Sequence, residues 1–205
     1  MSLYARYVLP RLTDLVMRNQ VNKAERTKLI PLASGVVLEV GIGSALNLPF
    51  YGPSVKKVYG VDPSPELWEI GRRRVEAASF PVEFLPCPAE RIRLDAAMAD
   101  CAVSTWTLCT IPDPAAALAE ITRVLRPGGQ LLFIEHGWAP DRQVQAWQNR
   151  LTPAWKRIAG GCHMNRRIDH LIADAGLHIV EIEREYGSGP KLLAYLYKGR
   201  AQRVG

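Results

Sequence analysis

The 205-residue sequence contains no apolar run that approaches the length of a membrane-spanning helix. Its first residues include no uninterrupted apolar stretch of the kind that secretory signal peptides carry. We therefore expect a cytoplasmic location, with association at a membrane surface left open. The sequence also lacks internal repeats and low-complexity segments. A single domain over residues 1–205 is the simplest organisation for this length.

Cysteine is scarce, and no two cysteines form a Cys-x-x-Cys pair. The four are Cys87, Cys101, Cys109 and Cys162. This scattering predicts reduced thiols, and neither a disulfide framework nor a zinc site, so we expect no metal. The net charge of +6 favours anionic partners only mildly. Charge alone leaves nucleic acid and an anionic membrane surface open, but we expect no nucleic-acid partner.

The most informative stretch is residues 36–47, where an apolar run rich in β-branched residues ends in two glycines, Gly41 and Gly43. This pattern predicts a buried parallel strand, a tight turn and a following helix. Gly41 lets the chain turn sharply, and Gly43 removes a side chain so that the backbone can contact a ligand. Such a turn marks the ligand crevice of an open α/β sheet.

The residues around these glycines indicate which ligand fits. A dinucleotide site usually has a third glycine or an alanine where this sequence has Leu46. Glu39, at the end of the predicted strand, would repel a phosphate but suits a cation. S-adenosylmethionine (AdoMet) is cationic and carries no phosphate. A nicotinamide-dependent reductase is disfavoured further, because no Tyr-x-x-x-Lys pair occurs. A catalytically silent cofactor-binding module remains an alternative.

A second apolar run ends in Asp62, at the distance from Gly43 at which an acid usually meets the ribose hydroxyls of a nucleotide. An ionised Asp can accept a hydrogen bond from both hydroxyls. Pro63 follows, and its ring is predicted to lie on the adenine. The loop after a short third strand, residues 82–85, places Ala89 and Glu90 as candidate adenine contacts.

Two later strands end at the same crevice, since parallel strands present their carboxyl ends together. Thr105 follows the strand predicted over residues 98–104, and we expect it at the cofactor. Trp106 either shapes the acceptor pocket or packs under the next helix. His136 follows the strand predicted over residues 130–135, where it acts as a general base or makes a structural hydrogen bond.

Three further segments complete the predicted domain. Residues 1–30 form a basic, helical N-terminal extension; we favour a solvated face on a capping helix over a contact with a membrane surface. Residues 141–165 form an insertion that we expect to act as a lid. Residues 177–186 and 191–197 are predicted as a hairpin of two strands, which adds one antiparallel strand to the sheet.

With these residues assembled, the sequence resembles the class I AdoMet-dependent methyltransferases from about residue 36 to residue 198. The most specific segments are residues 37–43, 60–62 and 120–129; the last is typical of the group that includes the ubiquinone-biosynthesis C-methyltransferases. A narrower similarity to the thiol S-methyltransferase-like branch rests on residues 107–109, 135–136, 153–155 and 161–166. Bacterial phospholipid N-methyltransferases are also similar through the first half of the chain.

The resemblance implies a Rossmann-like α/β fold with a seven-stranded sheet of order 3-2-1-4-5-7-6, strand 7 antiparallel, and helices on both faces. It implies AdoMet as cofactor, with Gly41 and Gly43 along its methionine part, Asp62 on the ribose, and Ala89 and Glu90 near the adenine. Many relatives have an acid where this chain has Pro88, which removes a usual partner of the adenine amino group.

The reaction implied is methyl transfer to a small or lipophilic acceptor, with a thiol as the first candidate. A phospholipid amine and the carbon of a quinone precursor are the alternatives. The sequence does not indicate the oligomeric state.

Overall fold

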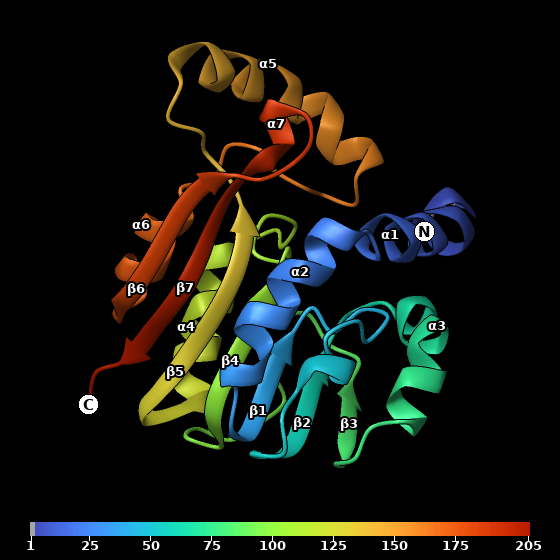
Figure 1. Cartoon of the computed structure of the whole chain (residues 1–205), viewed down its shortest axis with the longest axis vertical. Coiled ribbons are helices and arrows are strands. Elements are labelled where there is room, and N and C mark those ends of the chain that lie inside the picture. The colour runs from blue at the N-terminus through green and yellow to red at the C-terminus, as the bar shows by residue number, and fades with distance from the viewer. Residues whose placement is uncertain (1–2) are drawn as a thin grey trace.

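The computed structural model describes residues 3–205, which form one seven-stranded sheet of order β3-β2-β1-β4-β5-β7-β6 (Figure 1). The strands are β1 (Gly35–Val40), β2 (Val55–Val61), β3 (Val82–Leu85), β4 (Ala99–Thr105), β5 (Leu125–His136), β6 (Leu177–Tyr186) and β7 (Tyr195–Arg203). β7 pairs antiparallel with both β5 and β6, and the pairs among β1 to β5 are parallel. The predicted fold class, strand order and antiparallel seventh strand are confirmed.

Alternating side chains of the central strands face two separate hydrophobic cores, one on each side of the sheet. On β1, Leu38 packs in the core that contains α4 and α6, whereas Val37 packs in the core with Ile30 and part of α3. The helices are α1 (Leu9–Met17), α2 (Gln20–Leu29), α3 (Pro65–Glu76), α4 (Pro114–Val124), α5 (Arg142–Ile158), α6 (Ile168–Asp174) and α7 (Lys191–Ala194). Burial on both faces explains why the central strands are nearly continuous apolar runs.

The helix predicted directly after Gly43 is absent from the structure. Residues 41–47 form turns, and only the three-residue 3₁₀-helix η3 (Leu48–Phe50) follows before β2. Pro49 lacks a backbone N–H, and a residue before proline disfavours the helical region. The connection between β1 and β2 is therefore a loop that starts at the carboxyl end of β1, where the ligand crevice is predicted.

The N-terminal extension contains a π-helical turn, η1 (Tyr4–Val8), followed by α1, α2 and a short 3₁₀-helix η2 (Ile30–Leu32). The break lies between α1 and α2, because Asn19 caps α2 by accepting a hydrogen bond from the Asn22 N–H at 2.8 Å. Pro10 sits in the first turn of α1, where a proline is tolerated. No helix within residues 3–205 is long and apolar enough to cross a membrane.

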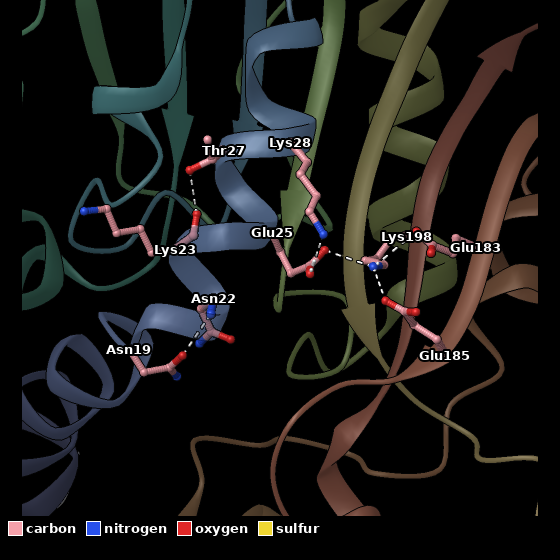
Figure 2. Close-up of polar contacts among 9 residues, drawn as sticks. All are labelled: Asn19, Asn22, Lys23, Glu25, Thr27, Lys28, Glu183, Glu185 and Lys198. Carbon is pink, nitrogen blue, oxygen red and sulfur yellow. Dashed lines mark hydrogen bonds and ion pairs between the residues drawn. The ribbon is translucent and has the colours of Figure 1, made fainter.

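α2 is fastened to the C-terminal hairpin by a nearly buried lysine on β7 (Figure 2). The Lys198 Nζ lies 3.0 Å from Glu25 of α2, 3.2 Å from Glu183 and 2.5 Å from Glu185. Lys28 adds a second cation at 3.4 Å from Glu25. Burial lowers the pKa of Lys198, but the three carboxylates outweigh it and leave that pKa above its ordinary value.

The C-terminal hairpin differs from the prediction in its second strand. β6 matches the predicted residues 177–186, but the four residues predicted to begin the partner strand form α7. Gly187 N–H donates to the Ala194 carbonyl at 2.8 Å and closes the hairpin around α7. α5 occupies most of the predicted insertion, and it lies beyond the carboxyl end of β5 (Figure 1). Its function as a lid stays a prediction.

Candidate active site

The two glycines after β1 differ in what surrounds them. Both have positive φ values, +73° at Gly41 and +49° at Gly43. A Cβ on Gly41 would lie 2.1 Å from the Thr107 Oγ1, so this glycine allows the loop after β4 to pack against the turn. A Cβ on Gly43 would meet nothing closer than 3.8 Å. Space beside Gly43 therefore remains for a ligand.

Asp62, at the end of β2, is joined to the Gly43 turn. Its carboxylate accepts hydrogen bonds from the Gly43 N–H at 3.0 Å and the Ser64 N–H at 2.8 Å. Burial raises the pKa of Asp62 to about 6, although both amides act to lower it. Each oxygen keeps a lone pair beyond these bonds, so the carboxylate can still accept two hydroxyl hydrogens.

Glu39 is buried in a polar network that sequence reasoning missed. It accepts hydrogen bonds from the Tyr51 hydroxyl at 2.8 Å and the Asn47 amide at 3.0 Å. Asn47 in turn donates to the Thr105 Oγ1 at 3.0 Å and accepts from the Arg26 Nε at 2.9 Å. Burial raises the pKa of Glu39 to about 7. Both donors act to lower that pKa, but burial outweighs them. The cofactor role of Glu39 stays a prediction.

Arg26 was assigned to the solvated basic face of the N-terminal extension, and this assignment is wrong. Only 4% of Arg26 is exposed. Its guanidinium lies 4.8 Å from the centre of the Trp106 ring and donates to the Met17 carbonyl. Trp106 is half-buried with a positive φ of 51°. α2 therefore supplies one wall beside the end of β4, and no local sequence signal distinguished this arginine from its exposed neighbours.

The three residues predicted to contact the adenine differ in their exposure. Pro63 follows Asp62 and is exposed, and Ala89 is buried. Glu90 accepts a hydrogen bond from the Asp113 N–H at 3.2 Å, so one of its oxygens faces the residue that caps α4. The adenine roles of these three residues stay predictions.

Glu135 holds the loop that follows β4. One carboxylate oxygen accepts hydrogen bonds from the Ser104 hydroxyl at 2.8 Å and from the N–H groups of Thr107 and Leu108, each at 3.0 Å. Its other oxygen is buried without a partner among the described residues. Arg166 donates to the Leu108 carbonyl and so also contacts this loop.

His136 lies among sulfur atoms. Its Nε2 is 3.0 Å from the Cys162 Sγ, and its buried Nδ1 has no partner among the described residues. The Cys109 Sγ completes a group whose ligand atoms all lie within 4.8 Å of one another. A hydrogen bond from Cys109 and the adjacent imidazole hold the pKa of Cys162 below its ordinary value. Burial lowers the pKa of His136, but the Cys162 contact outweighs it.

The methyltransferase domain family matches residues 38–133, the span that contains Glu39, both glycines, Asp62 and the loop after β4. The human thiol S-methyltransferase TMT1B is 33% identical over 193 residues, covering 89% of this chain and 78% of that protein. The rat form is 36% identical, and that match covers 72% of this chain and 62% of the rat protein, less than two thirds of its length.

The chain belongs to the class I AdoMet-dependent methyltransferases. A phosphatidylethanolamine N-methyltransferase from Cereibacter sphaeroides is also similar, at 31% identity over 72% of each chain. The N-methyltransferase NodS from Bradyrhizobium japonicum, solved with S-adenosyl-L-homocysteine, shares the fold with a TM-score of 0.70 at 16% identity, covering 92% of this chain and 90% of that one. Membership sets aside the nicotinamide-reductase and silent-module alternatives.

The residues present fit AdoMet as the methyl donor of this methyltransferase. No atom lies closer than 3.8 Å to a Cβ built on Gly43, and the Asp62 carboxylate keeps acceptor capacity next to it. Bound AdoMet supplies an activated methyl group on its sulfonium. The protein must then align the acceptor with that methyl and exclude water.

Proposed function

We propose that this methyltransferase transfers the AdoMet methyl group to the sulfur of a small or lipophilic thiol. The thiol S-methyltransferases among its relatives support this acceptor. The phospholipid N-methyltransferase supports an amine as the runner-up. A carbon acceptor in a quinone precursor is the third candidate, from the sequence resemblance.

The observation that carries the proposal is that Glu39, Glu135 and His136 are buried and each already contacts other protein groups. Glu39 is held by Tyr51 and Asn47. Glu135 is held by backbone amides, and both ring nitrogens of His136 are occupied by Cys162 or buried. An amine or carbon acceptor needs help to lose a proton, whereas a thiol with a pKa of about 8.5 supplies its own thiolate near neutral pH.

A panel of acceptors tests this function. The purified protein is incubated with AdoMet and, in turn, alkyl thiols, phosphatidylethanolamine vesicles and quinone precursors, and formation of S-adenosylhomocysteine is measured. We expect turnover on alkyl thiols, with a rate that rises with pH as more of each thiol ionises. Methylation of the phospholipid with no reaction on any thiol would overturn the proposal.

The predicted base role of His136 is tested on the same panel. If His136 removes a proton from the acceptor, His136→Ala should lower turnover by about 10²–10⁴-fold while AdoMet affinity stays nearly unchanged. A thiol acceptor requires no such base, so the loss on thiols should be much smaller than on amines. An equal loss of turnover on both acceptor classes would show that thiols and amines do not differ in their need for His136.

We also propose that the N-terminal extension and α5 contact an anionic membrane surface. Leu3, Leu15 and Ile158 are exposed to 77%, 69% and 59%, and the Tyr4 hydroxyl donates to the Ile158 carbonyl at 2.8 Å. The two helical segments therefore expose apolar side chains next to each other. Exposed cations in the same segments include Arg6, Arg11, Arg18, Lys156 and Arg157. This combination suits an interface with anionic lipid headgroups.

Sedimentation with vesicles tests the surface. We expect the protein to sediment with vesicles that contain phosphatidylserine and much less with purely phosphatidylcholine vesicles. Leu12→Glu with Leu15→Glu should abolish sedimentation. Val180→Glu, at a residue of β6 that is 53% exposed, is the matched control and should change nothing. Equal sedimentation of the double variant and the wild type would refute the assignment.

A further inference from the structure

The fold gathers two cysteines and one histidine that the sequence scatters. Cys109 lies in the loop after β4, His136 ends β5, and Cys162 follows α5. All three residues are buried, and their ligand atoms lie within 4.8 Å of one another. Sequence spacing predicted no zinc site, because it detects pairs of ligands in one loop and these three come from separate elements.

We propose that Cys109, His136 and Cys162 form a zinc-binding site. Two thiolates and an imidazole are the donor set that zinc prefers, and carboxylates or carbonyls, which magnesium and calcium require, are absent from this group. Two thiolates neutralise the dication. Three protein ligands leave a fourth position of a tetrahedral site for water or another anion, as in zinc sites that carry reactions.

The spacing of the three donors is close to what tetrahedral zinc demands. Bond lengths of about 2.3 Å to sulfur and 2.0–2.1 Å to nitrogen place tetrahedral ligands about 3.5–3.8 Å apart. The His136 Nε2 and Cys162 Sγ are 3.0 Å apart, and no pair in the group exceeds 4.8 Å. Side-chain movements of well under 1 Å at each donor bring the three to this spacing.

The backbone around the donors is already held in place. The His163 N–H, next to Cys162, donates to the Cys109 carbonyl at 2.7 Å and joins the two cysteine loops directly. Gly161 has a φ of +90°, and a Cβ there would lie 3.0 Å from the Thr110 carbonyl, so only glycine allows this close approach. Loops that are fixed before binding lose little conformational freedom when an ion binds.

The ring of His136 is oriented for metal binding. Its Nε2 faces the cluster, 3.0 Å from the Cys162 Sγ, and can bind an ion in the tautomer that leaves this nitrogen without a proton. The zinc site does not depend on which acceptor the methyltransferase uses. Binding of AdoMet and turnover of acceptors are therefore separate measurements from metal content.

Metal content of the whole reduced chain tests the site. Protein is stripped with a chelator, incubated with Zn²⁺, and freed of unbound metal before mass spectrometry of the elements. We expect one Zn²⁺ per chain. Replacement by Co²⁺ should produce thiolate-to-cobalt charge-transfer absorption in the near ultraviolet.

Variants locate the ion. Loss of a partner that merely supports a ligand costs about 10–100-fold in metal affinity, so Cys109→Ser, His136→Gln and Cys162→Ser should each lose at least that much. The cobalt absorption should disappear in both Cys→Ser variants. The matched control is Cys87→Ala with Cys101→Ala, which removes the other two cysteines and should keep full binding. Calorimetry with AdoMet shows that each variant is folded.

Three outcomes would overturn the proposal. The first is reduced, folded wild-type protein that takes up no Zn²⁺. The second is undiminished binding in the single-cysteine variants of the cluster. The third is uptake that depends on Cys87 or Cys101. A Cys109–Cys162 disulfide formed by peroxide, in protein that binds no zinc when reduced, would make the cluster a redox pair instead.

Discussion

The half of the crevice formed by β1 and β2 differs from the half formed by β4, β5 and the segment after α5. The first half is built from two turns that lie close in sequence. They are joined by the hydrogen bond that the Gly43 N–H donates to the Asp62 carboxylate. The second half joins Glu135, Arg166 and Cys162 from separate elements around the loop after β4. The half that we assign to the cofactor therefore depends on residues close in sequence, whereas the half that we assign to the acceptor is assembled only when the chain folds.

The largest effect is expected from Gly41→Val, which should damage both halves at once. The side chain would collide with Thr107 in the loop after β4, and a β-branched residue is strained at a φ of +73°. We expect loss of AdoMet binding together with a clear fall in melting temperature. Thermal unfolding and calorimetry measure the two. A variant with normal stability would show that the two halves are not coupled at this contact.

Gly43→Val should separate binding from packing. The Cβ of the new side chain meets no protein atom closer than 3.8 Å, but the side chain occupies the space assigned to the ligand. We expect AdoMet binding to be abolished in calorimetry, with a smaller loss of melting temperature than in Gly41→Val. Normal AdoMet affinity would remove Gly43 from the cofactor site.

Asp62→Ala should weaken AdoMet binding by about 1–3 kcal/mol, the range for hydrogen bonds to a charged group. Asp62→Asn keeps the shape and loses the charge, so its comparison with Asp62→Ala isolates the ionised carboxylate. Calorimetry on both variants measures the effect. An unchanged dissociation constant in folded Asp62→Ala protein would place the ribose elsewhere.

AdoMet affinity should depend on pH through Asp62. Because burial raises the pKa of Asp62 to about 6, its carboxylate is ionised at pH 8 and becomes protonated as the pH falls through 6. We expect the dissociation constant to be flat between about pH 7 and 8 and to rise about tenfold by about pH 5. The free protein responds oppositely, because a raised acid pKa favours folding at low pH. Asp62→Asn should abolish the rise in the dissociation constant.

Arg166→Ala should have the smallest effect on the cofactor. Its guanidinium donates to the Leu108 carbonyl on the acceptor side, so its loss should cost about 1–3 kcal/mol of folding stability. AdoMet affinity should change less than about threefold, while KM for the acceptor rises. A large loss of AdoMet affinity would contradict the division between the two halves.

Sequence was sufficient for the fold and for the positions of the two turns after β1 and β2, because strand patterns and Gly-x-Gly turns depend on neighbouring residues. The cofactor roles of the residues in these turns stay predictions. Two local predictions were wrong: a helix directly after Gly43, and a strand over the residues that form α7. In both places a few residues next to a proline decide the backbone conformation. Arg26, Tyr51 and Cys162 escaped detection for another reason. Their roles come from contacts with residues far along the chain, and their local context is ordinary.

The Lys198 cluster links folding of the two ends of the chain. Glu25 lies on α2, which is synthesised before every strand of the sheet, and its partner lies on β7, which inserts between two strands made earlier. α2 cannot take its final position through this contact until β7 has paired. Closure of such a long loop is a slow step in folding. The wall beside Trp106 is therefore among the last parts of the crevice to form on a growing chain.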